Sequence, residues 1–161
     1  MNQSYQAVIA APFGALGVCT EGGRLTAIDF LPLQHPLLDP SDPLGREICA
    51  ALNAYLDAPG SACKCPAMPA GTAFQQRVWR ALQAIPVGHT VSYGELAERV
   101  GSGARAVANA CGANPLPILI PCHRVVAKNG LGGFMRGRAS ASLDLKQWLL
   151  DHERRKSVSA G

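Results

Sequence analysis

The amino-acid sequence predicts an α+β protein: a small antiparallel sheet with one helix, followed by a mostly helical region that contains a helix-turn-helix. Three observations support this fold class. Short apolar runs separated by glycine or proline fill the first part of the chain, as expected for strands joined by tight turns. Apolar residues then recur at helical spacing. A stretch rich in proline, alanine and glycine lies between these parts. We therefore expect an N-terminal domain at residues 1–57, a linker at 58–70 and a C-terminal domain at 71–161.

The first half of the N-terminal domain reads as a three-stranded meander. Strands are predicted at residues 5–11, 15–20 and 25–31, each with short apolar runs. Gly22 and Gly23 lie between the last two strands and are typical of a two-residue hairpin turn. No catalytic arrangement is visible in this part, because its acidic residues are scattered.

One helix is expected next, at residues 43–56. Either Asp42 or Ser41 can cap its first turn with a side-chain oxygen. Pro43 suits the first helical position, where a backbone N–H would have no partner within the helix. This helix completes the N-terminal domain.

Four helices are expected in the C-terminal domain, at residues 72–85, 93–100, 104–113 and 142–153. The second begins with the S-x-x-E capping box that Ser92 opens. A glycine turn joins it to the third, which is the helix-turn-helix pattern. The third helix is rich in alanine and glycine, so it is slim enough to approach a groove closely. These small side chains can equally serve to pack against the preceding helix.

The most informative stretch is NPLPILIPCHRVV at residues 114–126. Pro121 ends an apolar run, and Cys122, His123 and Arg124 follow at once. We therefore predict the thiol at the end of a strand, with a second strand resuming after the arginine. Fixed positive charge beside a thiol favours the thiolate, and the histidine can take or share the proton. The alternative is an inert buried cysteine beside a structural histidine.

Charge is divided unevenly along the chain. Residues 1–70 hold three basic and six acidic residues, a net charge of −3, whereas residues 71–161 hold twelve basic and five acidic residues, a net charge of +7. The basic part is the part that carries the Cys-His-Arg motif. This split indicates a polyanionic partner for the C-terminal domain.

Cysteine usage indicates a cytoplasmic protein with reduced thiols. The six cysteines are irregularly spaced, and the N-terminus lacks the pattern of a secretion signal. No apolar run has the length of a membrane helix. Cys63 and Cys65 are one residue too close for the usual CxxC zinc knuckle, so we expect no metal and no cofactor.

Taken together, the motifs resemble the O6-alkylguanine-DNA alkyltransferases, the suicide DNA-repair proteins. PCHRVV resembles their active-site signature. Residues 71–153 also carry, in the family's order, GTAFQQRVW, IPVGHTVSYGELA, ARAVANACGANP and KQWLLDHE. The resemblance implies direct-reversal repair of double-stranded DNA. A methyl or alkyl group would pass irreversibly from O6 of guanine, and from O4 of thymine, to Cys122, once per molecule, without a cofactor and in a monomer.

The resemblance also implies the catalytic residues. Cys122 would attack the alkyl carbon, His123 would act as its base through a water, and Glu153 would orient that histidine. Asn114 would join the recognition helix to the active-site strand. Tyr93 would crowd the phosphate and help to rotate the nucleotide out of the duplex.

The remaining implied residues contact DNA or line the substrate pocket. Arg105 would enter the base stack from the minor groove and fill the gap left by the flipped nucleotide. The implied DNA-binding residues are Tyr93, Arg105, Ala106, Asn109 and Arg124. The implied pocket residues are Pro117, Val125, Phe134 and Met135. Phe134 stands where the family commonly has tyrosine, and Met135 stands where some members have a hydroxyl residue. Methyl transfer is expected to survive both departures because the nucleophile set is complete.

Three other functions remain open from the sequence. An alkyltransferase-like protein would bind lesions and recruit excision repair, but such relatives lack the reactive cysteine that Cys122 supplies. A helix-turn-helix regulator would need several long polar side chains to read the major groove, and this recognition helix is mostly small. A Cys-His-Glu hydrolase would turn over on esters or amides and ignore DNA, which the basic C-terminal domain and Arg105 argue against.

Overall fold

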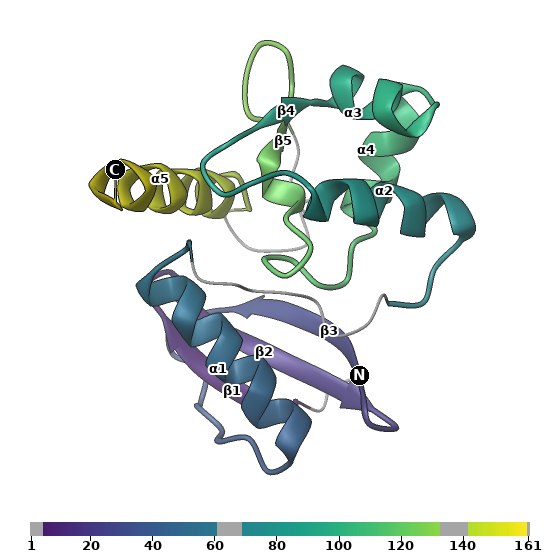
Figure 1. Ribbon diagram of the computed structural model, residues 1–161. Helices are drawn as coiled ribbons and strands as arrows, with labels where there is room; N and C mark the ends of the chain where they lie inside the picture. The colour runs from purple at the N-terminus through teal and green to yellow at the C-terminus, as the bar shows by residue number, and fades with distance from the viewer. Residues whose placement is uncertain (1–4, 61–68, 133–141, 161) are drawn as a thin grey trace.

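The computed structural model describes residues 5–60, 69–132 and 142–160 (Figure 1). The strands are β1 (Ala7–Ala11), β2 (Gly14–Glu21), β3 (Arg24–Leu31), β4 (Val91–Ser92) and β5 (Val125–Val126). The helices are α1 (Pro43–Asp57), α2 (Ala73–Gln83), α3 (Tyr93–Val100), α4 (Ala104–Gly112) and α5 (Ser142–Ala160), with a short 3-10 helix, η1 (Cys122–Arg124). Within the described part of the chain, no helix combines the length and the hydropathy needed to cross a membrane.

The N-terminal part is an antiparallel sheet in the order β1-β2-β3, with α1 lying across it (Figure 1). Gly22 and Gly23 form the turn between β2 and β3 with φ of 58° and 76°, a left-handed conformation that glycine adopts without strain. The Asp42 carboxylate accepts a hydrogen bond from Gly45 N at 2.6 Å and caps α1. The predicted meander, helix and cap are confirmed, with strand ends shifted by one or two residues.

The C-terminal part packs α2, α3 and α4 together. The indole of Trp79 on α2 is buried and donates to Ala110 O on α4 at 2.9 Å. The predicted capping box forms: Ser92 Oγ accepts from Glu95 N at 3.0 Å, and Glu95 accepts from Ser92 N at 3.1 Å. Gly101, with φ of 71°, ends α3 and starts the turn into α4. The helix, glycine turn and helix are therefore in place.

The strand predicted to end at Cys122 does not form. Asn114 is buried and folds this segment into turns: its Nδ2 donates to Ile120 O at 2.8 Å, and its Oδ1 accepts from Leu116 N at 2.9 Å. Prolines within the segment lack the N–H that a strand ladder needs. Cys122 instead begins η1, and Ile118 takes a left-handed φ of 75°.

Two further elements differ from the prediction. The strand after the motif, β5, pairs in parallel with β4, a short strand that the sequence did not suggest. The last helix was predicted to stop at residue 153 with a frayed tail, but α5 runs to Ala160. In addition, the 58–70 linker lies largely outside the described residues, so the division into two domains stays a prediction.

The sheet and the helical part share one apolar core. Ile28 N on the edge strand β3 donates to Pro115 O in the turn after α4, at 2.9 Å. The rings of Phe13 and Trp148 meet edge to face with centroids 5.1 Å apart. A single cluster of buried apolar side chains includes residues of both parts. The N-terminal part is thus packed directly against the elements that carry the Cys-His-Arg motif.

Candidate active site

Cys122 is held in a tight backbone turn inside the protein. Only 4% of its surface is exposed. Its N–H donates to Ile120 O at 2.8 Å, and Arg124 N donates to Pro121 O at 3.0 Å. Because both ends of the motif are fixed by short-range hydrogen bonds, the backbone sets the direction of the thiol.

Glu153 on α5 connects the motif to two helices. Its carboxylate is 1% exposed. Oε2 lies 2.6 Å from His123 Nε2 and accepts from Tyr55 OH at 2.7 Å. Arg124 donates to both oxygens, from Nε to Oε1 at 2.9 Å and from a terminal nitrogen to Oε2 at 3.0 Å. Burial raises the pKa of Glu153, but hydrogen bonds and positive charge from His123 and Arg124 outweigh it and hold the pKa well below the usual range. Glu153 is therefore an anion.

His123 is fully buried and faces this anion with Nε2. A carboxylate only accepts hydrogen bonds, so the neutral ring carries its proton on Nε2 and keeps a lone pair on Nδ1. Nδ1 is buried and has no hydrogen-bond partner among the described residues. Burial lowers the pKa of His123, against the raising effect of Glu153. The ring is thus neutral near pH 7, and Nδ1 is available as a base.

Arg124 is an interior residue, which contradicts the DNA contact predicted for it. It is 7% exposed, and every guanidinium nitrogen has a partner. Besides the two bonds to Glu153, one terminal nitrogen donates to Ile85 O at 2.6 Å. The guanidinium charge of Arg124 is therefore paired with the buried Glu153 carboxylate. Its hydrogen bonds connect η1 to α5 and to the segment that follows α2.

Lys146 on α5 is a site residue that the sequence reading missed. It is 0% exposed, and its Nζ donates to Val125 O at 2.7 Å and to Leu131 O. Burial lowers the pKa of Lys146 to about 8, while the neighbouring thiols of Cys122 and Cys111 act in the opposite direction. The sequence did carry a signal for Lys146: it lies seven residues before Glu153, which places both side chains on one face of α5.

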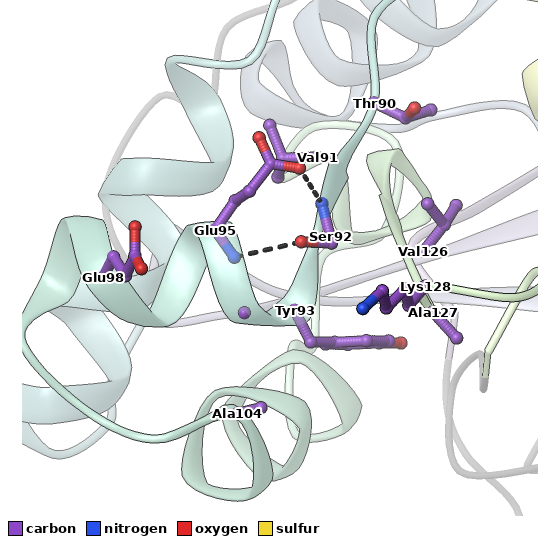
Figure 2. A pocket seen from close by; sticks show the side chains of 11 residues that line it. Thr90, Val91, Ser92, Tyr93, Glu95, Glu98, Ala104, Val126, Ala127 and Lys128 are labelled. Carbon is purple, nitrogen blue, oxygen red and sulfur yellow. Dashed lines mark hydrogen bonds between the residues drawn. The ribbon is translucent and has the colours of Figure 1, made fainter.

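Tyr93 opens α3 and is partly buried. Lys146 Nζ lies 5.8 Å from the centre of its ring. Tyr93 also lines a surface pocket of about 730 Å³. Figure 2 shows this pocket, with the hydrogen bonds of the Ser92–Glu95 capping box beside it. The residues that line it are Thr90, Val91, Ser92, Tyr93, Gly94, Glu95, Glu98, Ala104, Val126, Ala127 and Lys128.

The other predicted residues divide between the surface and the core. Arg105, Ala106 and Asn109 are exposed on α4. Pro117 and Val125 are buried close to the motif in the sequence. The structure leaves Phe134, Met135, Cys63 and Cys65 outside the described residues. Among the residues that are described, no group of three or more His, Cys, Asp or Glu side chains is arranged to hold a metal ion.

Cys122, His123 and Glu153 together form an arrangement suited to a nucleophilic thiol. Nδ1 of His123 is the ring nitrogen left to accept a proton, and an imidazolium formed in this way would be stabilised by the Glu153 anion. Lys146 adds a cation to the surroundings of the thiol. The chain thus holds a buried thiol next in sequence to a neutral imidazole that contacts a buried carboxylate, a set that could act as nucleophile, base and orienting group.

Known proteins with similar sequences include methylated-DNA–protein-cysteine methyltransferases. A family model described as the DNA-binding domain of 6-O-methylguanine DNA methyltransferase matches residues 73–155. The methylated-DNA–protein-cysteine methyltransferase of Haemophilus influenzae is 35% identical over 170 residues, covering 100% of this chain and 92% of that protein. The protein of the same name from Mycolicibacterium paratuberculosis is 54% identical over 93 residues, covering 56% of this chain and 53% of that protein. A probable methyltransferase of Acanthamoeba polyphaga mimivirus is 48% identical over 54% of this chain and 56% of its own length. For these last two relatives, the match spans only about half of the relative's length.

Solved structures share the fold. The R37L variant of the Mycobacterium tuberculosis O6-methylguanine methyltransferase superimposes with a TM-score of 0.74 at 34% identity, over 92% of both chains. The Mycobacterium tuberculosis OGT in complex with DNA gives a TM-score of 0.72 at 37% identity, again over 92% of both chains. The predicted α+β class, with a small antiparallel sheet followed by helices, is confirmed.

Proposed function

Because the chain belongs to the 6-O-methylguanine DNA methyltransferase family, we propose that it repairs DNA by moving an alkyl group from O6 of guanine onto Cys122. The observation that carries the proposal is a buried Cys122 followed by His123, whose Nε2 contacts Glu153 and whose Nδ1 has no partner among the residues that the structure describes. A thioether has no good leaving group, so each molecule would act once. O4-alkylthymine is proposed as a second substrate, on the resemblance alone.

The transfer we propose is an in-line displacement. The Cys122 proton passes, through a water, to Nδ1 of His123, and Glu153 stabilises the imidazolium. The sulfur then forms a bond to the alkyl carbon as the carbon–O6 bond breaks, and the electron pair stays on the guanine. The guanine takes up one proton, which balances the proton released by the Cys122 thiol, and is restored to its unmodified form. Tyr93 would donate a hydrogen bond to the base. A reduced thiol is required, which a cytosolic compartment maintains.

We propose that α3, the glycine turn and α4 act as a helix-turn-helix that enters the minor groove. The target atom lies inside the base stack, so the nucleotide must be flipped out. The exposed face of α4 is small at Ala106 and carries Arg105 and Asn109, which supports close approach with one long side chain reaching into the stack. The net charge of +7 over residues 71–161 favours the DNA backbone. One chain carries every named group, so we propose a monomer.

Two further roles complete the proposal. Asn114 links α4 to the turn that precedes Cys122, through its bonds to Ile120 O and Leu116 N, and would transmit crowding by an alkylated Cys122 to the DNA-binding helix. Pro117 and Val125 would form part of the wall of the alkyl pocket. Phe134 and Met135 remain predictions for the same pocket.

The amount of guanine restored per protein chain tests this function. With excess duplex oligonucleotide that carries one O6-methylguanine, restored guanine should rise and stop at one equivalent per protein chain, because no step regenerates the thiol. Continued turnover would exclude a suicide transferase, and lesion binding without any restored guanine would favour the lesion-binding alternative.

Replacing Arg105 with alanine is expected to lower the second-order rate constant for repair of duplex DNA about tenfold or more, since stacking at a nucleotide is worth roughly 1–3 kcal/mol. Arg46→Ala is the matched control, because it removes one exposed arginine from α1, outside the proposed interface. Rates from single-turnover repair decide the matter. If the rate constant falls by the same factor in both variants, the loss reflects the overall positive charge of the protein, and Arg105 has no specific role in the interface.

A further inference from the structure

The N-terminal part reaches the candidate active site through one side chain of α1. Tyr55 is 1% exposed, and its phenol donates to Glu153 Oε2 at 2.7 Å across 98 residues of sequence. His152, the residue immediately before Glu153, donates from Nε2 to the backbone oxygen of Tyr55 at 2.9 Å. The Tyr55 and His152 rings also meet edge to face at 5.4 Å. Two consecutive residues of α5 therefore fix both ends of Tyr55.

The phenol binds the same carboxylate oxygen that contacts His123. Oε2 receives Tyr55 OH, His123 Nε2 and one nitrogen of Arg124, whereas Oε1 receives Nε of Arg124. Arg124 alone could hold the carboxylate as a bidentate pair. The phenol adds a donor from a different direction, so the carboxylate cannot swing away from His123 without losing a buried hydrogen bond.

We propose that Tyr55 is a positioning residue for alkyl transfer, which fixes Glu153 against His123 and disperses part of the charge that His123 faces. This inference rests on the proposed function. The N-terminal part would then have a role in the reaction besides packing, because Tyr55 on α1 supplies one of the hydrogen bonds to Glu153.

The expected consequence is a change in pH dependence. A hydrogen bond to a carboxylate stabilises its charge, and loss of that bond makes the carboxylate a stronger partner for an imidazolium. Without the phenol, the pKa of His123 should therefore rise, and the neutral base should be lost at a higher pH during acidification. Among the described residues, the charged or ionisable side chains that act on His123 or Glu153 are Arg124 on η1, Lys146 on α5 and Tyr55 on α1. The thiols of Cys122 and Cys111 act on Lys146, and His152 on α5 contacts Tyr55. Replacing Tyr55 leaves all the others in place.

The test is Tyr55→Phe in the full chain, which keeps the ring and removes only the oxygen. Single-turnover transfer from O6-methylguanine duplex is measured from pH 5 to pH 9. We expect the acid limb of the rate profile to move up by about half a pH unit, with a plateau rate several-fold lower. Tyr5→Phe is the matched control: it removes a tyrosine–carboxylate hydrogen bond at 3.0 Å between Tyr5, just before β1, and Asp29 on β3. Its profile should match that of the wild type.

The outcomes separate the two levels of the proposal. An active wild type together with an unshifted Tyr55→Phe profile, whether or not the rate falls at all pH values, overturns the role of Tyr55 and leaves the proposed function standing. A wild type that transfers nothing overturns the proposed function itself. In either case, imidazole NMR titration of the free protein reads His123 directly. A titration that is the same in wild type and Tyr55→Phe also overturns the inference.

Discussion

Replacing Cys122 with serine is expected to abolish alkyl transfer while the protein stays folded and still binds lesion-containing duplex. A serine hydroxyl fits the space of the thiol, but it is barely ionised near neutral pH and is a far weaker nucleophile. The rate should fall on the order of a thousandfold or more, to the limit of detection. Transfer of radiolabelled methyl from DNA to protein measures it, and a gel-shift assay measures binding.

The matched control for this variant is Cys49→Ser. Cys49 is also a buried cysteine, 5% exposed, but it lies on α1 and takes no part in the His123–Glu153 network. It should retain transfer at close to the wild-type rate. Labelled methyl on Cys122→Ser, or loss of transfer in Cys49→Ser with an intact fold, would show that the nucleophile is misassigned.

Replacing Glu153 with glutamine should lower the free energy of unfolding by about 3–5 kcal/mol at pH 7, because it leaves the buried Arg124 without its counter-charge. It should also slow transfer, since His123 loses the anion that keeps its proton on Nε2. Urea denaturation and single-turnover kinetics measure the two effects. Asp144→Asn, an exposed carboxylate in the first turn of the same helix, is the control and should change little.

The stability effect of Glu153 has a defined pH dependence. Its pKa is depressed in the folded protein, so its contribution is complete above the unfolded-state pKa of about 4.3 and is lost as pH falls towards the folded value. Below about pH 4 the wild type should therefore lose stability more steeply than Glu153→Gln. A gap between the two proteins that stays the same from pH 7 to pH 3 would rule out an ion-pair origin.

Local signals in the sequence predicted most of the elements. The Asp42 cap, the Ser92–Glu95 capping box and the Gly22–Gly23 turn each depend on residues three or fewer positions apart, and all three are observed. The apolar spacing within each helix is equally local. Such features can be recognised without knowing where the chain goes next.

What the sequence did not predict depends on distant residues. The pairing of Val91 with Val125 joins two short strands from different parts of the chain. The interior position of Arg124 follows from Glu153, 29 residues away, and the place of Tyr55 follows from the same carboxylate, 98 residues away. The segment before Cys122 forms a turn and not the predicted strand, because the Asn114 side chain hydrogen-bonds Ile120 O and Leu116 N. Strand propensities do not account for such side-chain bonds to the backbone.

The most direct test of the account is where the methyl group goes. The full chain is incubated with excess duplex oligonucleotide that bears one O6-methylguanine, digested, and its peptides are weighed by mass spectrometry. We expect one methyl per chain, on the peptide that contains Cys122, with every other cysteine peptide unmodified. A methyl on a different residue, or restored guanine with no methyl on the protein, would contradict the assignment of Cys122 as the acceptor.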